Sequence, residues 1–150
     1  MADDRRTPRF RAGARAVPAD MRPEWRIPLL VLELSKCRAR TGSLKQLHIL
    51  NWALRGPDAW PAFQRAYAGH PHPDDVTLRF DPTLDRTIDR AIGDGLVEWT
   101  SKGRLRLTAG GDQFAEILIG SDVLSEPRLM LTSIPGLLTQ ARFDQIAEAI

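Results

Sequence analysis

The chain has 150 residues, of which 43% are hydrophobic and 27% are charged. This composition is ordinary for a globular protein and excludes disorder of the whole chain, and the single cysteine, Cys37, excludes an internal disulfide framework or a cysteine-based zinc site. The net charge of +2 conceals a gradient, because residues 1–40 carry ten Lys or Arg against five Asp or Glu, whereas residues 107–150 carry two against six. The excess of positive charge in the first part of the chain is typical of a segment that binds a polyanion or an acidic partner. It is equally typical of a flexible arm that only interacts with solvent.

No targeting signal is expected in the amino-terminal region. Its first residues, MADDRRTPRFRAG, lack the apolar core of a signal peptide, and the apolar run 29–32 is too short to span a bilayer. We therefore expect a cytoplasmic protein without a membrane partner. Residues 1–24 mix Pro, Ala, Arg and Asp without a period, which predicts a flexible basic arm.

Two helices are predicted next. Pro28 suits a first helical turn, so one helix is expected from there to about residue 40, with Leu29 and Leu32 lying outside its main apolar stripe. Ser43 and Gln46 have the spacing of a capping box that begins a second helix. The inner face of that helix is predicted at Leu44, Leu47, Leu50 and Leu54, and Gly56-Pro57 is expected to end it.

Residues 57–80 have the least regular pattern. A short helix is predicted over 60–68, and residues 76–80 alternate like a strand. The pair His70 and His72 has the spacing of two metal ligands, but the flanking prolines favour a turn.

A third helix is predicted from Asp81-Pro82 to about Asp94, and Gly95 is expected to end it. Two alternating segments, 96–99 and 104–107, then flank a turn at Lys102-Gly103 and predict a hairpin. A helix over about 111–119 and a last amphipathic helix within 133–150 complete the chain.

This order of elements predicts a mainly α-helical winged helix-turn-helix domain with a small β-hairpin and a C-terminal amphipathic helix. The domain is expected over 25–120, and residues 121–150 form a helical extension. One core is expected to hold the third helix, the second helix and Trp99 of the hairpin.

No catalytic motif is found in the sequence. It contains no phosphate-binding glycine loop, no metalloprotease motif and no nucleophile elbow, and few histidines and cysteines remain from which to build a triad. We expect a protein without catalytic residues, cofactor or metal.

Nucleic-acid contact is the standard use of this fold, so its charges are informative. The hairpin carries Lys102, Arg104 and Arg106 with no acid among them, which suits phosphates or an acidic protein surface. The predicted recognition helix carries Arg86 and Arg90 against four aspartates over 81–94, which opposes entry into a groove lined by phosphates. We therefore expect any nucleic-acid contact to be indifferent to sequence.

Apolar positions on the first and last helices predict a partner interface, because they exceed what docking onto one core requires. The predicted interface residues are Leu29, Leu32, Leu137, Leu138, Phe143, Ile146 and Ile150.

The segments SLKQLHILNWALRG and RFDPTLDRTIDRAIGDGLVEWTSKGRLRLTAGGDQFAEIL carry a family resemblance. With the Asp81-Pro82 helix start, the Gly-Leu-Val exit and the Leu-Thr-x-x-Gly turn, the region 27–150 resembles the small middle component of bacterial ABC-three-component systems, which include Lamassu-type phage-defence operons. The resemblance implies a non-catalytic accessory subunit bound to an SMC/Rad50-like ATPase that senses foreign or broken DNA, beside an effector subunit such as a nuclease.

Two other classes of function stay open. A winged-helix transcriptional regulator of the MarR or PadR kind would be a homodimer that reads two half-sites, and the first or last helix would supply its dimer contact. A scaffold or adaptor would make no DNA contact at all.

Overall fold

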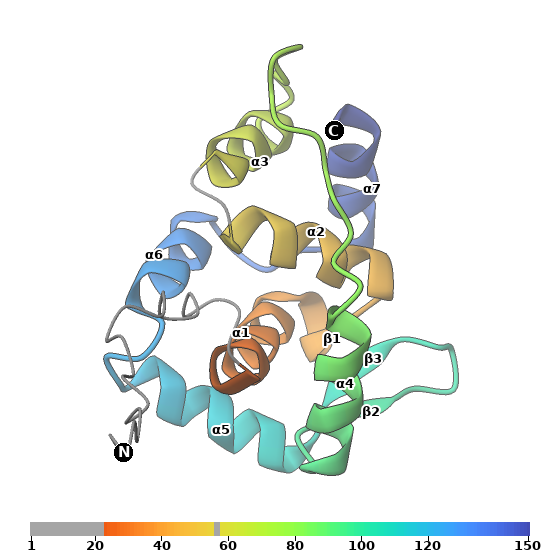
Figure 1. Cartoon of the computed structure of the whole chain (residues 1–150), viewed down its shortest axis with the longest axis vertical. Helices are drawn as coiled ribbons and strands as arrows, with labels where there is room; N and C mark the ends of the chain where they lie inside the picture. Colours follow the sequence, from red (N-terminus) through yellow and green to blue (C-terminus); the bar gives the residue numbers. More distant parts are fainter. Residues whose placement is uncertain (1–22, 56–57) are drawn as a thin grey trace, which may run out of the picture.

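The structure, a computed structural model, describes residues 23–55 and 58–150. Over these residues the chain is mainly helical and has one small antiparallel sheet (Figure 1). The elements are α1 (Pro23–Lys36), the 3-10 turn η2 (Arg38–Arg40), β1 (Thr41–Gly42), α2 (Leu44–Arg55), α3 (Ala59–Tyr67), α4 (Leu84–Gly93), β2 (Val97–Trp99), β3 (Leu105–Leu107), α5 (Ala109–Ile119), α6 (Ser125–Ser133) and α7 (Gln140–Ala149). Residues 1–22 of the predicted arm lie outside the described residues. The helix end predicted at Gly56-Pro57 also lies outside them.

Helix α1 is the centre of the fold. It contacts α2, α4, α5 and α6, and its side chains Leu30, Val31 and Leu34 are at most 1% exposed. The predicted start at Pro28 is wrong: the helix begins five residues earlier and tolerates Pro28 in its interior. That proline removes one backbone hydrogen bond, but the added turn brings Arg26 to Asp81 and packs Trp25 and Ile27 against the core.

Helix α2 starts with the predicted capping box. The Gln46 backbone N–H donates to Ser43 Oγ, and the Ser43 backbone N–H donates to Gln46 Oε1 at 2.8 Å. Leu47, Leu50 and Leu54 are buried as predicted. Leu44 is 37% exposed, so the prediction that it belongs to the inner face is wrong. It is the first residue of the helix, next to the cap.

The sheet has three strands in the order β1-β3-β2, all antiparallel. The predicted hairpin is confirmed, with Val97 opposite Leu107 and Trp99 opposite Leu105. The edge strand β1 was not predicted, since two residues are too few to show alternation. Trp99 is 48% exposed, so its expected place in the core is wrong.

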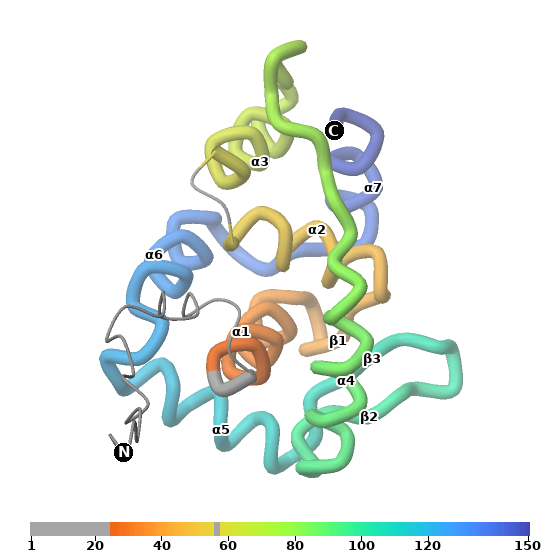
Figure 2. The backbone as a smooth tube through the Cα atoms, viewed as in Figure 1, coloured from red at the N-terminus to blue at the C-terminus, as the bar shows by residue number. Residues whose placement is uncertain are grey.

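Residues 68–83 run from α3 to α4 without a helix or strand (Figure 2). The strand predicted over 76–80 is therefore wrong, because the segment pairs with no strand in the described part of the chain. Phe80 instead stacks on the His48 ring at 4.5 Å while remaining 58% exposed. The short helix predicted just before this segment is confirmed as α3.

The last third of the chain shares the main core. The Thr108 hydroxyl accepts from the Gly111 N–H and caps α5, which begins two residues earlier than predicted. Helix α6 was not predicted, whereas α7 lies within the predicted last helix. Leu131, Phe143 and Ile146 belong to the same hydrophobic cluster as α1, and so residues 121–150 pack as part of one core.

Candidate nucleic-acid interface

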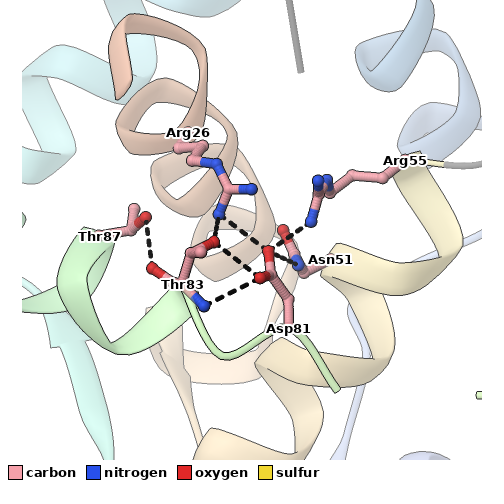
Figure 3. Close-up of polar contacts among 6 residues, drawn as sticks. All are labelled: Arg26, Asn51, Arg55, Asp81, Thr83 and Thr87. Atoms are coloured by element: carbon pink, nitrogen blue, oxygen red, sulfur yellow. Dashed lines mark hydrogen bonds and ion pairs between the residues drawn. The ribbon is translucent and has the colours of Figure 1, made fainter. Parts of the chain in front are cut away.

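Helix α4, in the predicted recognition position, is fixed by a partly buried ion-pair cluster at its start. The Asp81 carboxylate accepts from the Thr83 backbone N–H and pairs with Arg26 at 2.8 Å and with Arg55, while the Asn51 amide donates to it at 3.4 Å (Figure 3). Burial by itself raises the pKa of Asp81, but the hydrogen bonds from Thr83 and the two guanidinium charges lower it to about 2. The cluster ties α1 and α2 to the entry of α4.

The outer face of α4 carries both of the arginines predicted to contact nucleic acid. Arg86 and Arg90 are exposed, and so are Asp85 and Asp89 next to them in the chain. The exposed helix face therefore has no net charge. Carboxylates there oppose the approach of phosphates, so α4 offers little electrostatic attraction to a duplex.

Of the hairpin cations, Arg104 does not extend freely into solvent. Its Nη2 donates to Gln46 Oε1 at 3.2 Å and to the Thr41 carbonyl at 3.5 Å, so the side chain folds back over β1 and is half-buried. The Arg104 Nε is buried without a hydrogen-bond partner. Both acceptors are neutral, so neither compensates the positive charge of the guanidinium.

Arg106 forms an ion pair with Glu98, which was not predicted. Its Nη2 lies 2.8 Å from Glu98 Oε1 on the adjacent strand, and the two side chains are about equally exposed, at 50% and 49%. Residues directly opposite on one face of an antiparallel pair meet in this way. The expectation that no acid accompanies the hairpin cations is therefore wrong. Lys102 is exposed in the turn and has no ion-pair partner among residues 23–55 and 58–150.

Two further cations, which were not predicted, lie beside β1. Arg38 lies in η2 just before β1, and Lys45 lies in the first turn of α2 just after it, and both are exposed. We name Arg38, Lys45, Lys102 and Arg104 the basic edge. None has an ion-pair partner in the described part of the chain; Arg38 and Lys45 flank β1, and Lys102 and Arg104 belong to the β2–β3 turn. Arg40, beside them, pairs with Asp112 at 2.5 Å.

The backbone of η2 is held in an uncommon conformation. Ala39 and Arg40 have φ angles of 57° and 52°, in the left-handed region that costs non-glycine residues about 1–2 kcal/mol each. Hydrogen bonds from Arg38 N to the Leu138 carbonyl and from Arg40 N to the Cys37 carbonyl fix the turn. As a result Arg38 is presented at the surface from a rigid turn, at a position where a continued α1 was predicted.

Most of the predicted partner interface is covered by the chain itself. Leu29, Leu32, Leu138, Phe143 and Ile146 are between 0% and 6% exposed, because α5, α6, α3 and α2 pack over α1 and α7. The premise that these side chains are left uncovered is wrong. Of the seven predicted residues, Leu137 is 58% exposed and Ile150 is partly buried.

The described residues do not assemble a metal-ligand group of three or more His, Cys, Asp or Glu side chains, and His70 and His72 lie in the exposed connection after α3. Cys37 is 1% exposed, and burial, together with the nearby Glu33 charge, raises the pKa of its thiol to about 12. Within the same residues, no helix has the length and apolar character needed to cross a membrane.

Comparison of the chain with protein-family models, with curated proteins and with solved structures gives no match.

Proposed function

We propose that the protein is a winged-helix-like, non-catalytic accessory subunit that contacts nucleic acid through the phosphate backbone and does not read its sequence. The order α1, β1, α2, α4, β2 and β3, with the hairpin projecting beside α4, supports a winged-helix arrangement in which α3 is an insertion (Figure 1).

One observation carries this proposal: the basic edge has an excess of positive charge, and the exposed face of α4 does not. Arg38, Lys45, Lys102 and Arg104 supply four positive charges without an ion-pair partner in the described part of the chain, whereas arginines and aspartates balance on the outer face of α4. Phosphate contacts of Lys and Arg give affinity and steep salt dependence without sequence information.

The biological setting follows from the sequence resemblance. The middle component of ABC-three-component systems would act beside an SMC-like ATPase and an effector in anti-phage defence. A subunit of this kind needs no catalytic group of its own, and backbone contact would help to hold the ATPase on DNA.

The nucleic-acid part is tested by equilibrium binding of the full chain to two unrelated DNA duplexes of equal length at several salt concentrations. Equal affinities that fall steeply with salt are expected. A strong preference for one duplex would contradict the proposal and favour a sequence-reading regulator.

The subunit part is tested by co-expression with the genes next to its own, followed by affinity purification through this chain. Stable recovery of an ATPase is expected. A homodimer that leaves those products behind and binds a palindromic duplex would contradict the proposal.

A further inference from the structure

A groove of about 530 Å³ lies where the end of α1, the end of α5, α6 and the connection 134–137 meet. We name it the α1–α6 groove. Buried Leu32, Leu131 and Ile134 line it, and Ile119 and Leu137, which are 59% and 58% exposed, stand at the surface beside them. Large side chains exposed around an apolar groove are typical of surfaces that bind another protein.

Two cations line this groove, and neither pairs with a carboxylate of the described residues. Lys36 Nζ donates to the Ile134 carbonyl at 2.6 Å, and Arg128 Nη1 donates to the Ile119 carbonyl at 2.8 Å. The Arg128 Nε is buried and has no hydrogen-bond partner. Burial also lowers the pKa of Lys36, since its ammonium is partly removed from water and faces only a neutral acceptor.

The charge of the groove contrasts with that of the surrounding sequence. Residues 107–150 contain six acids and only two basic residues, Arg128 and Arg142, and none of the residues that line the groove is acidic. Arg142 lies over the Tyr67 ring and is not among the residues that line the groove. An anionic group in the groove would therefore meet two cations that now have only neutral acceptors.

We propose that the α1–α6 groove binds an acidic amphipathic helix of a partner protein. Apolar side chains at helical spacing would fill the space between Leu131 and Leu137, and Asp or Glu at the flanks would pair with Lys36 and Arg128. The groove and the basic edge share no residue, so variants can test the two surfaces independently. This proposal rests on the subunit part of the proposed function.

The test uses the whole chain and a displayed library of amphipathic peptides about four helical turns long. Each peptide has leucine or isoleucine at helical spacing and Glu, Gln or Lys at random elsewhere, so that selection reports the charge that the groove prefers. The strongest binder is then titrated by fluorescence anisotropy. We expect it to be rich in Glu and to lose at least about tenfold in affinity to Leu137→Asp. The matched control Ile117→Asp, on an exposed α5 residue outside the groove, should leave the affinity unchanged.

Selection of Lys-rich or Gln-rich peptides, no selection at all, or binding that survives Leu137→Asp would overturn the proposal. A wild-type dimer that Leu137→Asp converts to a monomer would assign the face to a second copy of the chain and overturn it as well.

A pair of lysine variants separates this proposal from the nucleic-acid one. Lys36→Gln should weaken peptide binding and leave duplex binding unchanged. Lys45→Gln should weaken duplex binding and leave peptide binding unchanged. Circular dichroism checks that both variants are folded. If both variants lose peptide binding, the groove assignment is overturned. If neither variant loses duplex binding, only the assignment of nucleic-acid contact to the basic edge is contradicted.

Discussion

Glu98 and Arg106 face each other across β2 and β3, with the Glu98 Oε1 atom 2.8 Å from the Arg106 Nη2 atom. Because both side chains are about half exposed, the pair adds little to stability, typically about 0–1 kcal/mol. The main effect of the pair is on the charge of the hairpin. Arg106, one of the three hairpin cations predicted to contact phosphate, is already neutralised by Glu98.

Glu98→Gln should therefore strengthen duplex binding. Removing the carboxylate frees Arg106 for a phosphate, which should increase the salt dependence by about one contact. The measurement is duplex affinity against salt concentration. Glu116→Gln, which removes the same charge from the exposed side of α5, is the control and should change little; equal gains in both variants would attribute the effect to net charge alone.

Gly111→Ala should destabilise the protein strongly. A Cβ at this position in α5 would collide with the Leu96 carbonyl oxygen, and backbone cannot move aside as a flexible side chain can. We expect a loss of about 1–3 kcal/mol or more in the free energy of unfolding, measured by chemical denaturation. Gly93→Ala is the matched control, because its Cβ would meet nothing within 4 Å, and the change should be neutral or stabilising. Equal stability of the two variants would mean that α5 does not pack on residue 96 as described.

Glu33 should reduce stability at neutral pH. It is 1% exposed, and neither carboxylate oxygen has a hydrogen-bond partner. Burial raises its pKa well above 4.5, against the opposing charge of Arg55. The native state thus keeps a proton that the unfolded chain releases, so stability present below about pH 4.5 is lost as the pH rises toward the folded pKa.

Glu33→Met should consequently raise the free energy of unfolding at pH 7 by about 1–4 kcal/mol, and the gain should shrink toward pH 4.5. Thermal or chemical unfolding at several pH values measures it. Glu126→Met, at an exposed position of α6, should show no such pH dependence. A destabilised Glu33→Met protein at pH 7 would show that the carboxylate has a stabilising partner.

Asp81 should have the opposite pH dependence. Its pKa of about 2 lies below the usual 3.8, so its contribution is present above about pH 4 and is lost as the pH falls toward 2. Asp81→Asn should cost about 2 kcal/mol at pH 7, and the difference from wild type should close below pH 4. Asp89→Asn, on the exposed face of α4, should stay within about 0.5 kcal/mol. If the Asp81→Asn protein is less stable than wild type by the same amount at all pH values, the shape of the Asp81 side chain, and not its charge, explains its contribution to stability.

Local signals in the sequence predicted the elements that depend on neighbouring residues. The Ser43–Gln46 capping box and the hairpin around Gly103 were of this kind, and both are confirmed. The prediction of a strand over 76–80 was wrong, because an alternating pattern does not by itself provide a partner strand. The start of α1 was missed because it depends on the contact between Arg26 and Asp81, which are far apart in the sequence.

The candidate site was less predictable than the fold for the same reason. Arg104 and Arg106 were identified as cations, but their partners Gln46 and Glu98 were not foreseen. Arg38 and Lys45 were missed because their place at the sheet edge depends on the turn between α1 and β1. The run Arg-Ala-Arg before Thr41 was the one signal available, and it was assigned to a continuing helix.

The most direct test of backbone contact at the basic edge compares two charge variants of the full chain. One carries Arg38→Gln, Lys45→Gln and Lys102→Gln, and the other carries Arg86→Gln and Arg90→Gln on α4. Duplex affinity is measured against salt concentration for both. The basic-edge variant should lose affinity and lower the salt dependence by about three phosphate contacts, while the α4 variant should bind nearly as well as wild type. Loss of binding in the α4 variant, with the basic-edge variant unaffected, would contradict the proposed function and assign nucleic-acid contact to α4.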